Sequence, residues 1–64
     1  MGVNYKLKEA RGRKGLTQIQ LAEAIGLSTI GYSRKENGIR KFTEEEIKNI
    51  CQVLEMEVTD IFFN

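Results

Sequence analysis

Few side chains in this sequence are suited to covalent or acid–base chemistry. The 64 residues include no histidine and a single cysteine, Cys51. A cysteine nucleophile needs a neighbouring base that activates the thiol, and the residue most often used for this purpose, histidine, is absent. Cys51 also falls on the apolar face of a predicted helix, so we expect it to be a small buried hydrophobic residue.

Metal and cofactor chemistry find equally little support. With no histidine and one cysteine, the chain has no set of zinc ligands and no intrachain disulfide. The carboxylates closest together in the sequence, Glu44, Glu45 and Glu46, fit the first turn of a helix, where acidic groups interact favourably with the helix dipole. We therefore expect no enzyme activity, no metal, no cofactor and no small-molecule ligand.

Charge is distributed unevenly along the chain. The net charge is only +1, yet residues 1–41 carry nine Lys/Arg against three Glu, and residues 42–64 carry one Lys against six acidic residues. This asymmetry predicts a basic working surface and an acidic opposite surface, although the same charges could simply solvate a small domain. No stretch approaches the roughly 20 apolar residues that span a bilayer, and no signal peptide is recognisable. We expect a cytoplasmic protein with no membrane partner.

Start and stop signals divide the chain into five short helices. Two capping boxes, Thr17-x-x-Gln20 and Thr43-x-x-Glu46, mark the beginnings of the second and fourth helices. Apolar residues spaced i, i+3, i+4 and i+7 give the fourth helix a buried face. The predicted helical segments are Tyr5–Lys14, a second from Thr17 to Gly26, a third from Ser28 to Asn37, a fourth from Thr43 to Leu54, and a single turn near Thr59–Phe63. The sequence therefore predicts an all-α fold.

The second and third helices have the spacing of a helix-turn-helix. Ala22 is small where the two helices must cross closely, and Gly26 supplies the positive φ that the tight turn needs. Apolar residues form a wedge that holds the interhelical angle near the roughly 90–120° of such a unit. The wedge residues are Leu21, Ile25, Leu27 and Tyr32. We place the unit at about residues 17–37 of a single domain that spans 1–64.

The sequence resembles the XRE-type helix-turn-helix family, the Cro and repressor domains of phages and their bacterial relatives. The resemblance covers nearly the whole chain and implies a lambda-repressor-like fold of five short helices. The matching motifs are Gly15-Leu16-Thr17-Gln18, Leu21-Ala22-Glu23, Ile25-Gly26-Leu27-Ser28, Ser33-Arg34, Glu36-Asn37-Gly38, and Leu54 followed by Val58-Thr59-Asp60-Ile61-Phe62.

This resemblance implies that the third helix enters the DNA major groove with its N-terminal residues on base edges. The base contacts implied by position are Thr29, Ile30, Ser33 and Arg34. Arginine can chelate the O6/N7 edge of guanine, and isoleucine can meet a thymine methyl group, although Ile30 could instead belong to the core. Contacts to the DNA backbone are implied for Gln18, Asn37, Arg40 and Lys41. Arg40 and Lys41 could also be merely solvated.

The family also pairs an arginine of the first helix with the glutamate of the Glu-Asn-Gly motif. Arg11 and Glu36 match those positions, and we expect this pair to orient the third helix. Two residues depart from the family pattern. Lys35 stands where the family carries an inward aliphatic residue, so we expect its stem to lie over the core. Gly31 lies inside the third helix and should cost about 1 kcal/mol relative to alanine.

The function implied by the resemblance is sequence-specific binding of double-stranded DNA by a transcriptional regulator, which we expect to be a repressor. One such domain offers a small interface with DNA, so we expect a homodimer on an inverted-repeat operator. The predicted dimer interface is the apolar cluster Ile61, Phe62 and Phe63, with at least one member packed inward; all three could instead complete the core. The alternative function is a protein-interaction module, such as an antitoxin or anti-regulator.

Overall fold

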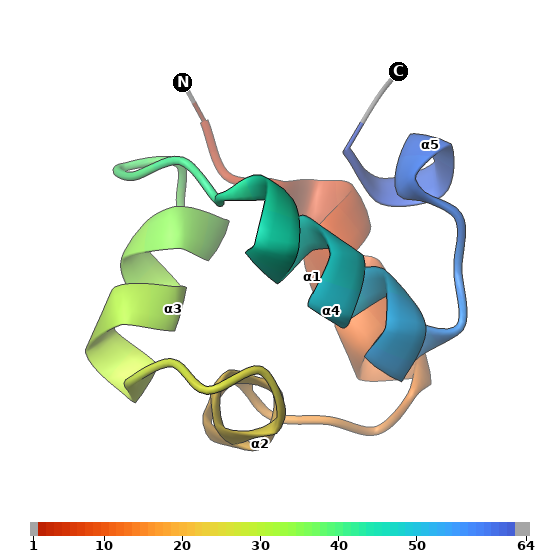
Figure 1. Cartoon of the computed structure of the whole chain (residues 1–64), viewed down its shortest axis with the longest axis horizontal. Helices are drawn as coiled ribbons and strands as arrows, with labels where there is room; N and C mark the ends of the chain where they lie inside the picture. Colours follow the sequence, from red (N-terminus) through yellow and green to blue (C-terminus); the bar gives the residue numbers. More distant parts are fainter. Residues whose placement is uncertain (1, 63–64) are drawn as a thin grey trace.

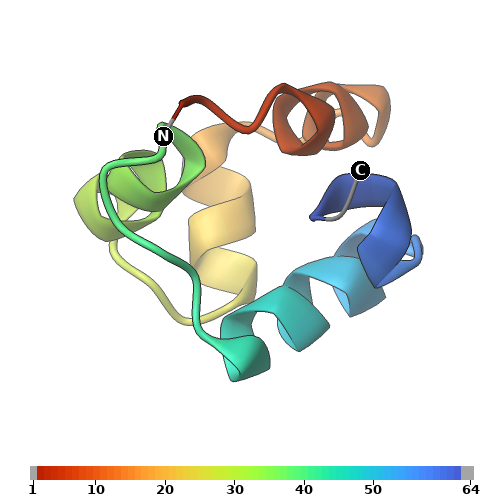
Figure 2. The same ribbon diagram turned by 90° about the horizontal axis from the view of Figure 1, so that it is seen from above.

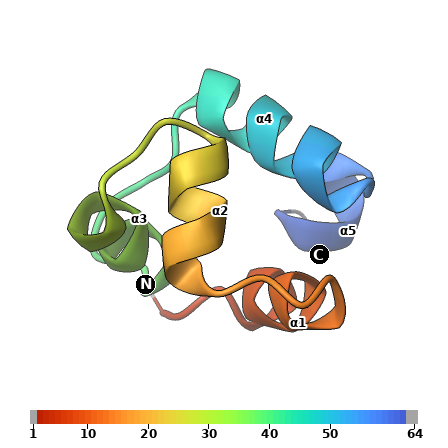
Figure 3. The same ribbon diagram turned by 90° about the horizontal axis from the view of Figure 1, so that it is seen from below.

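The computed structural model describes residues 2–62, which form five α-helices and no β-strand, as predicted. The helices are α1 (Tyr5–Arg13), α2 (Gln18–Ala24), α3 (Thr29–Glu36), α4 (Glu44–Leu54) and α5 (Val58–Ile61). Helices α1 and α4 lie on opposite sides of the core, α2 spans the distance between them, and α5 closes the other side (Figures 2 and 3). Helix α3 packs against α2 on the side of the molecule away from α5 (Figure 1).

Side-chain caps determine where the first four helices begin. Thr17 and Thr43 each accept a hydrogen bond from the backbone N–H three residues later. Gln20 and Glu46 accept in return from the threonine N–H groups, which completes both predicted capping boxes. These contacts satisfy donors that have no partner within the helix. The other two caps are Asn4 for α1 and Ser28 for α3.

The helix ends differ from the predicted ends by one or two residues. Helix α1 ends at Arg13, one residue earlier than predicted. Helix α5 spans Val58–Ile61 instead of Thr59–Phe63, because the Glu57 N–H donates to the Asp60 carboxylate and starts the turn earlier. The sequence offers no glycine at the end of α4, and Glu55 there takes the left-handed conformation, with a φ of 57°.

The core is a single apolar cluster to which all five helices contribute. Its members are Leu7, Ala10, Leu21, Ala22, Tyr32, Ile50, Cys51, Leu54 and Ile61. Of the predicted wedge, Leu21 and Tyr32 are fully buried, and Ile25 and Leu27 pack against the cluster while partly exposed. Burial, helped by the charges of Glu57 and Asp60, raises the pKa of the Cys51 thiol. Cys51 is therefore the buried hydrophobic residue that the sequence predicted.

An ion pair between α3 and α4 accounts for the unusual Lys35. Its Nζ lies 2.7 and 2.8 Å from the two carboxylate oxygens of Glu46, and only 18% and 14% of the two side chains are exposed. Burial opposes ionisation of Glu46, but bonds from Lys35 and from the Thr43 N–H outweigh it and hold the pKa of Glu46 below its usual value. The sequence predicts only the lysine stem over the core; in the structure the ammonium group has a partly buried partner as well.

Gly31, the other departure from the family pattern, lies in the first turn of α3. Its N–H donates to Ser28 Oγ over 3.0 Å, which is the cap of this helix. A Cβ at Gly31 would lie 3.0 Å from the same oxygen, closer than ordinary van der Waals contact. The glycine therefore leaves room for the cap, which offsets part of its cost in a helix.

We expect Gly38, directly after the cap residue of α3, to accept no side chain. Its φ is +82°, and a Cβ there would overlap the backbone carbonyl of Gly2. The left-handed conformation costs a residue with a Cβ about 1–2 kcal/mol, so with the overlap Gly38→Ala should lower the free energy of unfolding by more than about 2 kcal/mol. Urea unfolding followed by circular dichroism measures the loss.

Gly15→Ala is the matched control for this substitution. Gly15 has a similar φ of +75°, but a Cβ there meets no atom within 4 Å. The control therefore reports the conformational cost alone. Equal losses for the two variants would mean that the approach of Gly2 to Gly38 contributes nothing.

Candidate nucleic-acid interface

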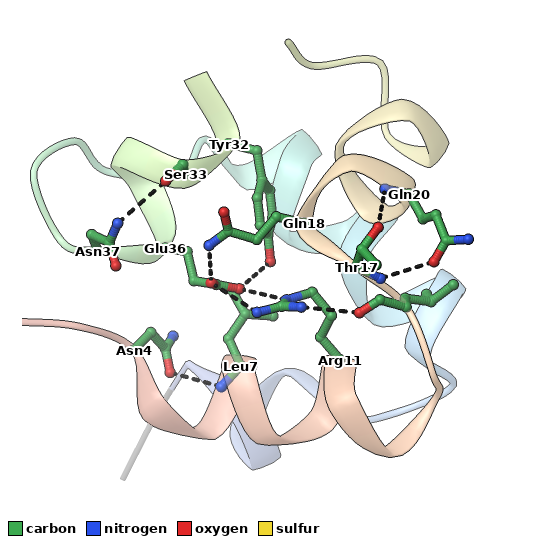
Figure 4. A network of polar contacts seen from close by, with 11 residues as sticks. Asn4, Leu7, Arg11, Thr17, Gln18, Gln20, Tyr32, Ser33, Glu36 and Asn37 are labelled. Atoms are coloured by element: carbon green, nitrogen blue, oxygen red, sulfur yellow. Dashed lines mark hydrogen bonds and ion pairs between the residues drawn. The ribbon is translucent and has the colours of Figure 1, made fainter. Parts of the chain in front are cut away.

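One buried carboxylate, that of Glu36, joins three helices. Its side chain is fully buried, and its two oxygens accept from Arg11 Nε at 3.0 Å and Nη2 at 3.2 Å. Gln18 Nε2 donates to Oε1 at 2.7 Å, and the Tyr32 hydroxyl donates to Oε2 at 2.6 Å. We call these four residues the Glu36 network (Figure 4). Arg11 and Glu36, the pair implied by the family, therefore lie in contact, with two further partners that the sequence did not indicate.

The Glu36 network keeps the buried carboxylate ionised. Burial alone would raise the pKa of Glu36, but the bonds from Arg11, Tyr32 and Gln18 outweigh it and hold this pKa below its usual value. The bond to Glu36 raises the pKa of the Arg11 guanidinium. Burial, together with the nearby carboxylate, raises the pKa of the Tyr32 hydroxyl. At neutral pH the network thus holds one negative and one positive charge.

The network also determines which side of α3 faces inward. Tyr32 and Glu36 are four residues apart on α3, and both are fully buried, so they define its inner face. The Glu36 carbonyl accepts from the Asn4 N–H at 2.9 Å, which attaches the end of α3 to the start of α1. Arg11 Nη1 donates to the Leu16 carbonyl at 2.9 Å and fixes the connection between α1 and α2. The opposite side of α3 must therefore face solvent.

Three of the four residues predicted to contact bases are exposed, Thr29 in the first turn of α3 and the other two on its outer side. They are Thr29, Ile30 and Arg34. Ile30 is 67% exposed, which excludes the alternative that it belongs to the core. Ser33 is half-buried, and its Oγ accepts from Asn37 Nδ2 at 3.3 Å. The four predicted base contacts thus combine a cation, two hydroxyl groups and an aliphatic side chain.

The loop after α3 begins as a fixed turn and carries two of the residues predicted to contact the DNA backbone. The N–H groups of Ile39 and Arg40 approach the Arg34 carbonyl, at 2.8 and 3.3 Å, so the turn is bonded to the last full turn of α3. Arg40 and Lys41 are exposed, and neither forms an ion pair within residues 2–62. Ile39 is 71% exposed; sequence reasoning missed it, although its position beside Arg40 was a signal.

The side-chain amide of Gln18 is only partly available to bind a phosphate. One N–H of its amide is used on Glu36, so only the rest of the amide can reach a ligand. Gln18 also lines a shallow depression of about 580 Å³, to which Thr17 and Ile19 of the start of α2 and Thr29 of α3 contribute. This depression brings together a predicted backbone contact and a predicted base contact. Ile19, 53% exposed, was not indicated by the sequence analysis.

The predicted dimer interface needs a correction. Ile61 is only 2% exposed and belongs to the core, because α5 packs against both α1 and α4 and turns this side chain inward. It cannot contact a second copy. Phe62 is half-buried, with its ring edge-on to that of Phe42 at a centroid distance of 5.5 Å. Phe63 lies outside the described residues.

The exposed side chains of α3 offer hydrogen bonding, charge and apolar contact.

No group of three or more His, Cys, Asp or Glu side chains within residues 2–62 is arranged to hold a metal ion. In the same range, none of the helices has the length and apolar character needed to cross a membrane.

One known protein family matches most of the chain. The profile of the family described as Helix-turn-helix matches residues 7–61. Two crystal structures of the clp gene regulator ClgR from Corynebacterium glutamicum are similar, with TM-scores of 0.82 and 0.78 and 32% sequence identity. Each similarity covers 89% of this chain, and 61% and 74% of the respective ClgR chains.

Two curated proteins are also similar in sequence. Cyanate hydratase from Coprinopsis cinerea is 38% identical over 55 residues, which are 86% of this chain and 36% of that protein. Antitoxin PezA from Streptococcus pneumoniae is 34% identical over 59 residues, which are 92% of this chain and 37% of PezA. The chain thus spans little more than a third of the length of either relative.

We expect Tyr32→Phe to destabilise the protein through the Glu36 network alone. The substitution keeps the buried ring and removes the hydroxyl that donates to Glu36. The loss of one hydrogen bond to a charged group should lower the free energy of unfolding by about 1.5–3 kcal/mol in urea titrations at neutral pH. Tyr5→Phe, at a position 72% exposed, is the control and should change it by less than about 0.5 kcal/mol. Similar losses would contradict the role of the hydroxyl.

Stability should also fall with acidification. The pKa values of Glu36 and Glu46 are lowered in the folded state. As the pH falls, the unfolded chain therefore binds more protons than the folded chain does. Their contribution to stability is complete above the unfolded pKa of about 4.3 and is lost as the pH falls through the folded values. Urea titrations at decreasing pH measure this loss. Glu36→Gln, although less stable, should show a shallower dependence on pH; an unchanged slope would contradict the assignment.

Proposed function

This chain belongs to the XRE-type helix-turn-helix family, and we propose that it binds double-stranded DNA and regulates transcription. The observation that carries the proposal is the division of α3 into two faces. Tyr32 and Glu36 anchor the inner face, while Ile30 and Arg34 are exposed on the outer one and Thr29 is exposed in the first turn. A helix held in this way can enter the major groove of B-DNA, which is about 12 Å wide. The similarity to ClgR, a clp gene regulator, supports a regulatory role.

The proposed reading of bases uses three kinds of contact. The Arg34 guanidinium donates two parallel hydrogen bonds to O6 and N7 of guanine. Ile30, exposed near the beginning of α3, packs on a thymine methyl group. Thr29 and Ser33 bond to base edges through their hydroxyl groups. The Ser33 hydroxyl accepts from Asn37 and retains its own hydrogen for donation.

Contacts to phosphates would set the position of α3 in the groove. Arg40 and Lys41 supply charge from the turn bonded to α3, and Asn37 supplies an amide. Gln18 would use the part of its amide that does not bind Glu36, which would link a phosphate directly to the Glu36 network. The excess of basic residues within 1–41 supports an attraction to DNA that weakens with salt.

We further propose that two copies bind an inverted repeat whose half-sites lie about one helical turn, or about 34 Å, apart. With Ile61 in the core, Phe62 and Phe63 remain as the candidate contacts between copies. A dimer placed over a promoter would act as a repressor by occluding it, and such a regulator would act in the cytoplasm.

A second candidate function is that of an antitoxin, and the 34% identity to PezA favours it. In that case the main partner of the chain is another protein, and the same fold serves as an interaction module. The similarity to cyanate hydratase is not sufficient ground for proposing an enzyme activity, because the matched residues are only 36% of that enzyme. The sequence also has no histidine.

Selection from a random duplex library at about 150 mM salt distinguishes the two candidates, since purely electrostatic binding is already weakened there. We expect enrichment of a short inverted repeat with half-sites about 10 base pairs apart. Recovery of unselected DNA, or of none, would overturn sequence-specific binding and favour the protein partner.

Substitutions at Arg34 and Lys41 should weaken DNA binding in different ways. Arg34→Ala should cost about 1–3 kcal/mol on the selected site and relax the preference at one base position. Lys41→Ala should weaken binding to all sequences alike and lower the slope of log K against log salt by about one. Fluorescence anisotropy at several salt concentrations measures both effects.

Lys48→Ala is the control for charge. Lys48 is the one basic residue among positions 42–64 and lies on α4, so its removal should leave affinity nearly unchanged. If Arg34→Ala has no more effect than Lys48→Ala, the proposed position of α3 in the groove is wrong.

A further inference from the structure

A groove between α4 and the start of α5 has no role in the proposed DNA contacts. One wall is a stripe of α4 residues spaced i, i+3, i+4, i+7 and i+8, and the other is the segment that leads into α5. The groove has a volume of about 450 Å³. The lining residues are Glu44, Ile47, Lys48, Cys51 and Gln52 from α4, and Met56, Glu57 and Val58 from the second wall. We call this feature the α4–α5 groove.

The floor of the α4–α5 groove is apolar. Ile47, Met56 and Val58 pack against the core from one side and remain partly exposed on the other. Cys51 contributes a nearly buried thiol. Met56 has a flexible, polarisable side chain of the kind that adapts to different apolar partners. The floor can therefore accept aliphatic side chains and adjust to their shape.

The rim of the groove is predominantly acidic. Glu44 and Glu57 are exposed, and neither forms an ion pair within the part of the chain that the structure describes. Lys48 is the one cation of the rim. The charges of Glu57 and Asp60 reach the floor, since they add to burial in raising the pKa of the Cys51 thiol. An occupant with basic groups beside its apolar side chains would match this field.

The dimensions and location of the groove favour a short helix. From Glu44 to Gln52 the α4 wall rises about 12 Å, which corresponds to two turns of a partner helix. The C-terminal half of α4 and α5 lie at the opposite side of the molecule from α3 (Figures 1 and 3). The groove begins at the first turn of α4, near α3, but none of its lining residues is among the proposed DNA contacts.

We propose that the α4–α5 groove binds a basic amphipathic helix of a partner protein. Apolar side chains at i and i+4 or i+3 of that helix fill the floor, and its flanking Lys and Arg face Glu44 and Glu57. A second copy of this chain is a poorer occupant. A symmetric contact places the same patch on both sides, so the acidic rims of the two copies would oppose one another. The proposal is independent of DNA binding, and its test uses no DNA.

The probe is a synthetic 14-residue peptide with leucines along one helical face and lysines elsewhere. Two matched peptides accompany it: one with glutamate in place of lysine, and one with the same composition scrambled to remove the apolar face. Binding to the full chain is measured by fluorescence anisotropy, and the binding site is mapped by amide chemical shifts. We expect the basic amphipathic peptide to bind with shifts centred on Ile47, Cys51, Met56 and Val58, and both matched peptides to bind at least about tenfold more weakly.

Neighbouring glutamates supply the control variants. Glu44 lines the groove, whereas Glu45, next to it in the first turn of α4, does not. Glu44→Lys should weaken the basic peptide about three- to tenfold, and Glu45→Lys by less than about twofold. Equal weakening by the two variants would mean general charge attraction and overturn the proposal. Shifts located elsewhere, equal binding of the three peptides, or groove signals that change when the protein alone is diluted, as expected for a second copy, would overturn it as well.

Discussion

Moving the charge of Glu36 out of water costs several kcal/mol, and much of the structure is arranged to offset that cost. Four hydrogen bonds from three side chains converge on this carboxylate. The donors belong to α1, α2 and α3, so these helices can satisfy the charge only in one relative arrangement. In a chain of 64 residues the apolar core is small, and hydrophobic burial is not directional. The hydrogen bonds to Glu36 are directional, and they therefore favour one orientation of α3.

A second carboxylate extends the same principle to α4. Glu46 closes the capping box of α4 through Thr43 and at the same time binds Lys35 of α3. The start of one helix and the position of another therefore depend on a single side chain. Together with the Asn4 bond to the end of α3 and the turn bonded to Arg34, these contacts hold α3 from its inner side and from its C-terminal end. None of these contacts involves the outer side of α3. The side-chain bond between Ser33 and Asn37 joins only residues of α3 and its cap.

Local signals in the sequence were sufficient to place the helices to within one or two residues and to predict two residue pairs. Thr17 with Gln20, and Thr43 with Glu46, act within three residues, so their spacing alone predicts them. Contacts over long sequence separations were accessible only where a family resemblance supplied them, as for Arg11 and Glu36. The Gln18 donor, the Lys35 partner and the choice of Ile61 as the inward member of its cluster depend on how helices pack, which no local pattern encodes. Tyr32 lies four residues before Glu36 on the same helix, so this spacing could have indicated their bond. The left-handed Glu55 has no sequence signal, since glycine is the usual residue there.

The two faces of α3 have a consequence for how this protein can change over generations. Tyr32 and Glu36 tie the inner face to stability, so substitutions there are removed by selection whatever DNA is recognised. Thr29, Ile30 and Arg34 are exposed, so we expect mutations at these positions to change the stability of the fold little. If α3 reads DNA as proposed, the preferred target can therefore diverge among descendants of one ancestral chain while the scaffold stays constant.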